Sequence, residues 1–311
     1  MVRSAARVVG LKASSAGLPC MAAVLQRVLM LVLCLELAVG SLRFEDRFQP
    51  NWAPDHVMYD GDLIELRLDN SSGCGFASKS KYLFGSVSVQ IKLVEGDSAG
   101  TVTAFYMSSV GEGHDELDFE FLGNVSGEPY IVQTNIYVNG TGNREQRHYL
   151  WFDPTKDFHS YSILWNRHQI LFMADNVPIR AFRKQQDTML QLPFPDSKPM
   201  WVYGSVWNAD DWATQGGRVK TNWSDAPFVS QFRGFEIDAC EVGGMPADQR
   251  SDDGATERGR CADAETGFWW DTPAKATLSP HQVRQLKWVS RRYKIYDYCR
   301  DAARFVVKPV E

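Results

Sequence analysis

The chain has 311 residues, of which 44% are hydrophobic and 23% charged, and its formal net charge is −5. This composition is typical of a globular protein, long enough for one large domain or two ordinary ones. Without its first 40 residues the chain retains 37 acidic and 29 basic residues, a net charge of −8. So acidic a body argues against nucleic-acid and anionic-membrane partners, whereas a neutral polysaccharide raises no such objection.

Residues 1–40 have the pattern of a secretory signal peptide. Basic residues precede a short apolar run (VLMLVLCLELAV, 28–39), which ends at Gly40 and Ser41. The run is shorter than the roughly 20 apolar residues of a membrane span. The acid-free, Ser/Ala-rich segment ahead of it has the composition of a transit peptide. A start at Met21 would leave a signal peptide of ordinary length and make residues 1–20 an upstream extension, so we expect secretion.

From about residue 44 to 235 the sequence consists of short strands separated by Gly, Asn, Asp and Pro. Alternation of apolar and polar residues is visible in several of them. Many short strands at regular spacing predict an all-β sandwich or barrel of antiparallel sheets. The expected strands include 63–68, 86–93, 101–108, 117–122, 130–137, 161–166 and 201–206.

The segment HDELDFEFLG at 114–123 alternates strictly, as a half-buried strand does. Its apolar residues can enter the core, while Glu116, Asp118 and Glu120 point together to the other face. Three like charges in a row repel one another and raise at least one pKa, so that one acid stays protonated near neutral pH. Glycoside hydrolysis needs such a pair, one ionised carboxylate and one protonated carboxyl group beside the scissile bond.

Retaining enzymes hold these two groups about 5 to 5.5 Å apart. The α-carbons of Glu116 and Glu120 would lie about 13 Å apart along a strand, at about 3.3 Å per residue, and the side chains must lean together to close the gap. We therefore assign Glu116 as nucleophile, Glu120 as acid/base and Asp118 as the residue that orients one of them. Two alternatives remain open at this point: an ordinary solvated sheet face, and a calcium site.

The C-terminal part has a different pattern. Residues 248–263 are charged and loop-like, and a helix is expected from Ser279 as N-cap and Pro280 at the first helical position. A single helix of this length rarely folds alone. We therefore expect residues 41–235 to form the sandwich and 236–311 an extension packed on it. The apolar residues that recur at helical spacing are Val283, Leu286, Val289 and Tyr293.

Four cysteines remain after residue 40, and spacing alone does not choose among their three pairings. Closing the polar loop between Cys240 and Cys261 would stabilise the fold by roughly 3 kcal/mol. Glycosylation sequons begin at Asn70, Asn124, Asn139 and Asn222, and they agree with secretion.

The sequence resembles the plant xyloglucan endotransglucosylase/hydrolases of glycoside hydrolase family 16. HDELDFEFLG is nearly the active-site signature of this family, and the likeness covers about residue 44 to the C-terminus. Further matching segments are YIVQTNIYVNGTGNREQRHYLWFDPTKDFHSYSILWN at 130–166, SVWNADDWAT at 205–214 and LKWVSRRYKIYDYC at 286–299.

The resemblance implies a concanavalin-like jelly-roll β-sandwich with a long cleft across one sheet. It also makes Glu116 the nucleophile and Glu120 the acid/base. Sugar contacts are implied for the acid/base residue and for the QTN, NRE and DDWAT segments. From the residues alone, Arg144 and Glu145 read as a surface ion pair. The implied substrate-binding residues are Glu120, Gln133, Asn135, Asn143, Arg144, Glu145, Asp211, Trp212 and Gly216.

The resemblance further implies a glycan on Asn124 beside the catalytic strand and a disulfide between Cys240 and Cys261. Family members commonly have a second disulfide, which would join Cys299 to a cysteine near the C-terminus, and residues 300–311 contain none. Cys299 is therefore free, paired elsewhere, or paired beyond residue 311. Cys74 is the other remaining cysteine, and we do not expect it to reach Cys299.

The implied function is cleavage of the β-1,4-glucan backbone of xyloglucan and its religation to another xyloglucan chain or oligosaccharide, with hydrolysis as the alternative. The compact segment 220–228 favours transfer, because the dedicated hydrolases of the family have a longer loop there. We expect a secreted monomer of the cell wall and apoplast that needs no metal or cofactor and binds no nucleic acid or membrane once the signal is removed. The alternative from another class is a non-catalytic, lectin-like carbohydrate-binding protein.

Overall fold

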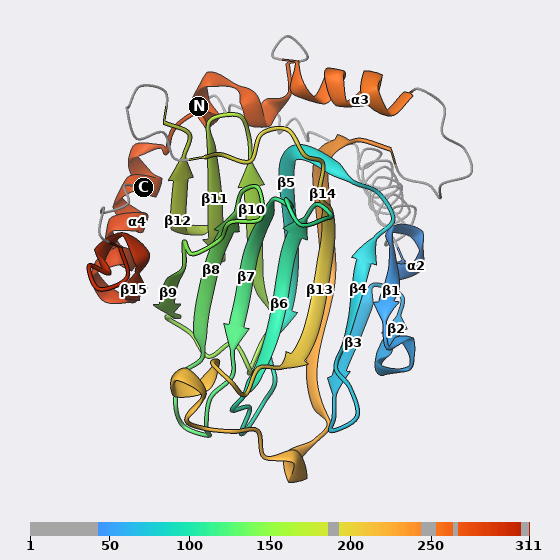
Figure 1. Ribbon diagram of the computed structural model, residues 1–311, viewed down its shortest axis with the longest axis vertical. Coiled ribbons are helices and arrows are strands. Elements are labelled where there is room, and N and C mark those ends of the chain that lie inside the picture. Colours follow the sequence, from blue (N-terminus) through green and yellow to red (C-terminus); the bar gives the residue numbers. More distant parts are fainter. Residues whose placement is uncertain (1–42, 186–192, 244–252, 264–266, 306–310) are drawn as a thin grey trace, which may run out of the picture. The chain divides into compact units, whose positions relative to one another are not determined.

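Two antiparallel sheets stack face to face in the computed structural model, which describes residues 43–185, 193–243, 253–263, 267–305 and 311 (Figure 1). One sheet has eight strands in the order β1-β4-β13-β6-β7-β8-β9-β15, and the other has seven in the order β12-β11-β10-β5-β14-β3-β2. The predicted all-β jelly-roll sandwich is confirmed. The predicted signal segment, residues 1–40, lies outside the described residues.

The expected strands are present with small differences at their ends. The strand expected at 86–93 begins earlier, at Tyr82, and the strand expected at 117–122 begins at Glu116. The strands are β1 (Phe48–Trp52), β2 (Val57–Asp60), β3 (Leu63–Leu68), β4 (Cys74–Ser78), β5 (Tyr82–Lys92), β6 (Thr101–Ser108), β7 (Glu116–Leu122), β8 (Ile131–Tyr137), β9 (Gln146–Tyr149), β10 (His159–Trp165), β11 (Gln169–Ala174), β12 (Val177–Arg183), β13 (Trp201–Asn208), β14 (Phe228–Glu241) and β15 (Lys294–Asp297).

Alternation along the strands divides core from surface. On β7, Leu117, Phe119 and Phe121 are fully buried between the sheets, as predicted. The ring of Phe119 meets Phe172 of β11 edge to face at 5.2 Å, so the two sheets interlock behind the acidic residues. Burying each such side chain contributes roughly 1.5–3 kcal/mol, which fixes the register of β7, because a slip by one residue would turn this row outward.

The α-helices in the described part of the chain are α2 (Phe44–Arg47), α3 (Asp253–Ala262) and α4 (Pro280–Arg292). The predicted start of α4 is confirmed: the Ser279 side chain accepts a hydrogen bond from the Gln282 N–H, and the Gln282 side chain accepts one from the Ser279 N–H. The prediction of a loop over 248–263 was wrong at α3. This stretch is charged and contains glycines, so its sequence gave little helical signal.

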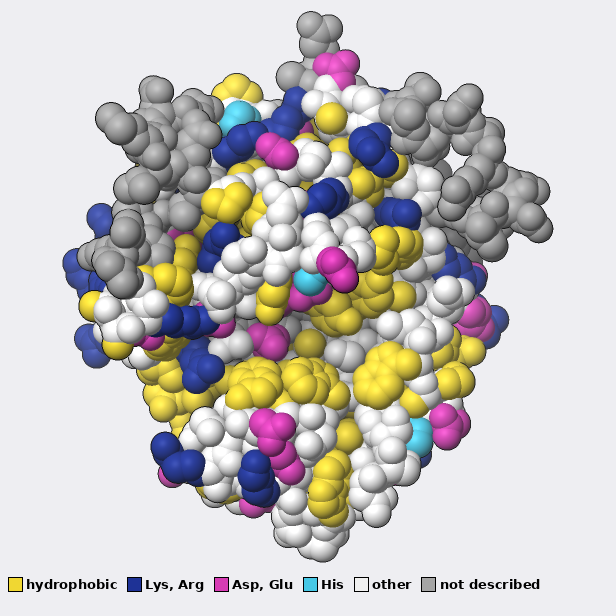
Figure 2. Space-filling model, viewed as in Figure 1, with side chains coloured by type: hydrophobic (Ala, Val, Ile, Leu, Met, Phe, Trp, Pro, Cys, Tyr) yellow, Lys and Arg dark blue, Asp and Glu magenta, His cyan; other side chains and the backbone are white. Residues whose placement is uncertain are grey.

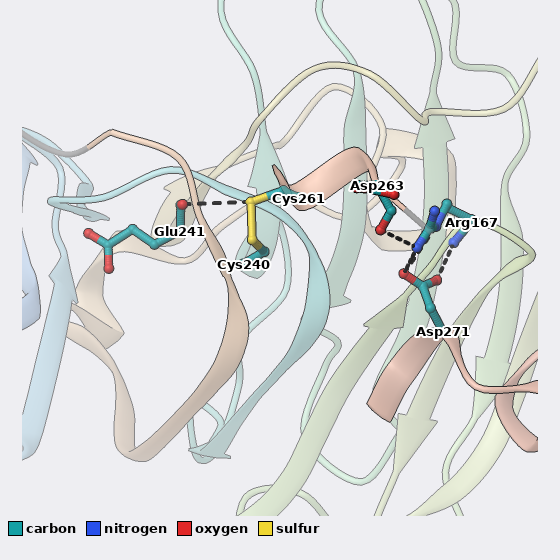
Figure 3. The surroundings of a disulfide bond; sticks show 6 residues. All are labelled: Arg167, Cys240, Glu241, Cys261, Asp263 and Asp271. Atoms are coloured by element: carbon teal, nitrogen blue, oxygen red, sulfur yellow. Dashed lines mark hydrogen bonds and ion pairs between the residues drawn. A yellow bond between two sulfur atoms is a disulfide. The ribbon is translucent and has the colours of Figure 1, made fainter. Parts of the chain in front are cut away.

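A disulfide between Cys240, near the end of β14, and Cys261 of α3 ties the extension to the sandwich (Figure 3). Nearby, the Arg167 guanidinium forms an ion pair with Asp271 at 3.0 Å and donates to the Asp263 carbonyl at 2.9 Å. Among the cysteines that the structure describes, Cys74 and Cys299 carry no disulfide. These cross-links explain how a weakly helical segment is held in place.

The C-terminal elements cover one side of the sandwich. Helix α4 contacts β12, and β15 pairs antiparallel with β9, so the extension adds the last strand of the eight-stranded sheet (Figure 1). None of the helices in the described ranges is long and apolar enough to cross a membrane.

Candidate active site

Strand β7 lies inside the eight-stranded sheet, between β6 and β8, and its three acidic residues share the face that points away from the core. Figure 2 shows acidic side chains in a hollow near the middle of the molecule, bordered by hydrophobic ones. Glu116 and Glu120 are half-buried, whereas Asp118 between them is only 5% exposed. The predicted placement of these carboxylates on one face is therefore what the structure shows.

Glu120 is held in a form suited to proton donation. Burial raises the pKa of its carboxyl group to about 7, and the negative charge of Glu116 adds to this rise. Two interactions act in the opposite direction and lower the pKa of Glu120. They are a 2.6 Å hydrogen bond from Gln133 Nε2 to Glu120 Oε2 and the positive charge of Arg147. At neutral pH a large fraction of Glu120 is thus protonated, as a general acid must be.

Asp118 is the most deeply buried of the three acids. Burial raises its pKa well above the ordinary value, and the charges of Glu116 and Glu120 raise it further. A hydrogen bond with Glu116 acts in the same direction, because it favours the protonated form of Asp118. A protonated Asp118 donates this bond and thereby orients the Glu116 carboxyl group.

The residues just before β7 are held in place by contacts with neighbouring segments. Buried Asp115 accepts a hydrogen bond from the Asn139 N–H at 2.8 Å and forms an ion pair with Lys198 at 3.2 Å. His114 stacks on Tyr137, and its Nε2 lies 3.8 Å from Glu116 Oε2. These contacts fix the path of the chain into β7.

Two predicted substrate contacts, Gln133 and Asn135, lie on β8 directly opposite Glu120 and Asp118. Besides its bond to Glu120, Gln133 accepts one from Arg147 Nε at 2.7 Å. The Asn135 side-chain oxygen is used internally, since it accepts from the N–H groups of Ile136 and Arg144 at 2.9 and 3.0 Å. Gln133 thus connects the acid/base candidate to β9, and Asn135 shapes the following loop.

The segment Asn143–Glu145 follows β8, and its three residues have different surroundings. Arg144 is buried and donates to the carbonyl groups of Ile136 and Gly142 at 3.0 and 3.2 Å, so it braces the loop. Arg304 of the extension donates to Asn143 Oδ1 at 2.6 Å and forms an ion pair with Glu145 at 2.7 Å. The ion pair that the sequence suggested between Arg144 and Glu145 is replaced by one between Glu145 and Arg304.

The remaining predicted residues lie after β13. Trp212 packs with Trp207, 6.1 Å between ring centroids, against a small apolar cluster that includes Leu122 of β7. Asp211 is exposed and lies 3.8 Å from Lys220. Gly216 has a φ of +70°, and a Cβ there would meet no neighbour within 4 Å, so its conformation, not crowding, favours glycine. This loop therefore borders the C-terminal end of β7.

The comparison with protein-family models agrees with this geometry. The model for glycosyl hydrolases family 16 matches residues 44–225, more than half of the chain. The chain belongs to family 16 of the glycosyl hydrolases. A second model, for the xyloglucan endo-transglycosylase C-terminus, matches residues 264–311.

Curated relatives of this family 16 chain are similar over nearly their whole length. Xyloglucan endotransglucosylase protein 6 of Diospyros kaki is 60% identical over 88% of this chain and 89% of its own. Xyloglucan endotransglucosylase/hydrolase protein 9 of Arabidopsis thaliana is 55% identical over 91% and 93%. Among solved structures, the chain is similar to a prokaryotic β-1,3-1,4-glucanase (lichenase) from a mouse hindgut metagenome, with a TM-score of 0.50 and 20% sequence identity. The match covers 62% of this chain and 93% of the glucanase, and it supports the fold alone.

Sequence reasoning on this family 16 chain missed two cations beside the site, Lys198 and Arg304. Both lie far in sequence from the residues that they contact and follow no alternating or helical pattern, so no local signal identified them. Asn124, the predicted glycan site, lies just after β7 and donates to the Pro129 carbonyl at 3.0 Å. Within the described ranges, no group of three or more His, Cys, Asp or Glu side chains is arranged to hold a metal ion.

Proposed function

We propose that this protein is a retaining xyloglucan endotransglucosylase, with Glu116 as nucleophile and Glu120 as acid/base. The observation that carries the proposal is the pair of glutamates on one face of β7, of which Glu120 has a pKa raised to about 7. The names of the close relatives supply the polysaccharide, and their family supplies the class of chemistry.

In the first half-reaction, the Glu116 carboxylate attacks the anomeric carbon of a backbone glucose and forms an ester bond to it. The glycosidic bond breaks, and its electron pair stays on the departing oxygen, which takes the proton of Glu120. Asp118 supports this step by its hydrogen bond to Glu116, which orients the attacking carboxylate.

In the second half-reaction, Glu120 is the base. It takes the proton from the 4-hydroxyl group of another glucan chain while that oxygen attacks the anomeric carbon and Glu116 leaves. Water in place of this hydroxyl group would give hydrolysis. The compact segment 220–228, with one short 3-10 turn at Trp223–Asp225, supports transfer, and so do the relatives named as endotransglucosylases.

Sugar contacts are proposed for the residues that border β7. Gln133 and Asn135 lie opposite the acids, Trp212 and Asp211 border one end, and the loop carrying Asn143, Arg144 and Glu145 lies beside Arg304; Gly216 belongs to the Asp211 loop. The proposed substrates are a xyloglucan donor and a xyloglucan or oligosaccharide acceptor, and these substrates support a location in the cell wall after secretion. Asn124 is the proposed glycan site.

The test mixes the secreted protein with xyloglucan and a labelled xylogluco-oligosaccharide, with no metal added. Wild type, Glu116→Ala and the matched control Glu112→Ala are compared; Glu112 is an exposed acid ahead of the strand. We expect label to enter polymer with wild type and Glu112→Ala and not with Glu116→Ala.

Two other outcomes would identify another function. New reducing ends without incorporation of label would identify a hydrolase. Binding to xyloglucan with no change in polymer length in any variant would identify a lectin-like protein.

A further inference from the structure

A single row of paired residues crosses the whole eight-stranded sheet through the proposed acid/base. Each member lies opposite the next across one inter-strand pairing, from the first strand of the sheet to the last. Residues that face each other across antiparallel strands point to the same side of the sheet. The row is Trp52, Gly75, Ser205, Ala104, Glu120, Gln133, Arg147 and Tyr296.

Trp52 starts this row on the edge strand β1, and its indole lies over the backbone of β4. A Cβ built on Gly75 would come within 2.5 Å of Trp52 Nε1, and one built on Gly73 within 3.0 Å of the far edge of the same ring. A side chain at Gly75 would push the ring off the sheet, whereas one at Gly73 would first clash with the Val206 carbonyl oxygen. Gly75 therefore leaves room for the indole on the face that carries Glu120.

The indole ring of Trp52 is accessible to a ligand. Trp52 is 38% exposed and belongs to neither hydrophobic cluster, although its neighbour Ala53 packs on the core. Gln49 and Asn51, beside it on the same edge, are exposed polar residues. An aromatic plate with a polar border suits a sugar ring, whose faces carry C–H groups and whose rim carries hydroxyl groups.

We propose that Trp52 is a remote sugar-binding platform, on which a backbone glucose of the same glucan chain stacks far from the bond that is cut. This inference rests on the proposed function. Four inter-strand steps of about 4.8 Å separate Trp52 from Glu120, so the platform lies about 19 Å along the row. A short oligosaccharide bound at Glu120 ends before it, whereas a long chain reaches it.

The glucan segment on the β1 side of Glu120 is either the donor half that becomes attached to Glu116 or the half that leaves and is replaced by the acceptor. Both have the same backbone chemistry, and the assay separates them. Transfer rates are measured with donors of one, two and several xyloglucan repeats against a fixed acceptor, and with acceptors of the same lengths against polymeric donor.

The variants are Trp52→Ala, Trp52→Phe as the conservative replacement, and Trp269→Ala as the matched control. Trp269 is 40% exposed and lies in the extension, where it donates to Asp238. We expect Trp52→Ala to lower kcat/KM for long substrates by about three- to tenfold in one of the two series, to leave the shortest substrate unchanged, and to be largely rescued by Trp52→Phe. The series that responds identifies the half of the glucan that lies on the β1 side.

An equal loss at every length, or no loss in either series, would overturn the platform, because a merely structural Trp52 does not distinguish chain lengths. If Trp52→Ala does not fold, Gly75→Ala displaces the indole without deleting it and must show the same dependence on length. A wild type that transfers no label would instead refute the proposed function, so the two failures are distinguishable.

Discussion

The hydrogen bond from Gln133 to Glu120 sets the upper pH limit of the proposed first step. Replacing Gln133 by Leu removes a 2.6 Å bond that lowers the pKa of a carboxyl group already raised by burial to about 7. A hydrogen bond to a charged group contributes about 1.5–3 kcal/mol, and one pKa unit corresponds to about 1.4 kcal/mol. Because Glu120 is half-buried, we take the lower end and expect its pKa to rise by about one unit.

An acid with a higher pKa stays protonated to higher pH, so the alkaline limb of the profile of kcat/KM should move upward by about one pH unit in Gln133→Leu. The assay records initial rates of label transfer at low xyloglucan concentration on both sides of pH 7. Gln90→Leu is the control, because this glutamine accepts a bond from Arg233 in the other sheet. An alkaline limb that stays in place, or that moves equally in the control, would refute the role of Glu120 as the acid.

Three further predictions concern the site and its support. Because the folded pKa of Glu120, about 7, lies above its ordinary 4.5, this group should cost wild type up to about 3 kcal/mol of unfolding free energy as the pH rises from 4.5 through 7. Glu120→Gln should lose less over the same range, because the raised pKa of Asp118 contributes in both proteins and that of Glu120 in wild type alone. Urea unfolding at both ends of this range checks the difference, and equal losses in the two proteins would contradict the raised pKa of Glu120. Arg304→Ala should raise KM for the labelled oligosaccharide about tenfold, because Asn143 and Glu145 lose their contacts with the guanidinium group. The control Arg300→Ala, at an exposed arginine, should leave KM unchanged, and equal KM values for the two variants would contradict the prediction. Cys240→Ser breaks the disulfide that joins two residues 21 positions apart, and it should lower the unfolding free energy by about 3 kcal/mol in non-reducing urea titrations. Cys299→Ser, at a free cysteine, should leave the unfolding free energy nearly unchanged. Similar urea midpoints for the two variants would count against the stabilising role of the disulfide.

The sequence was most informative where one local rule determined both structure and chemistry. On β7, a period of two separated Phe119 from Glu120, and the same alternation predicted the core, the shared face of the acids and the raised pKa. The start of α4 could also be predicted, because Ser279 and Pro280 are local signals. In each case the interactions that decide the outcome involve residues close in sequence.

The rest depended on contacts between distant segments. Arg304 reaches Asn143 across 161 positions, and no pattern of either segment indicates the other. Helix α3 was missed because its two glycines lower the helical propensity and its few apolar residues form no recurring pattern; its disulfide to β14 helps to hold it. The row that joins Trp52 to Glu120 required the order of the strands, which short-range alternation does not specify.

The pairing of β15 with β9 has a consequence for how the protein can be shortened. Without β15, the backbone N–H and C=O groups on the outer side of β9 would lose their partners, and such an open edge is a template for association between chains. A fragment that ends after β14 would therefore tend to aggregate even if its core remained intact. The extension thus protects the eight-stranded sheet from intermolecular strand pairing.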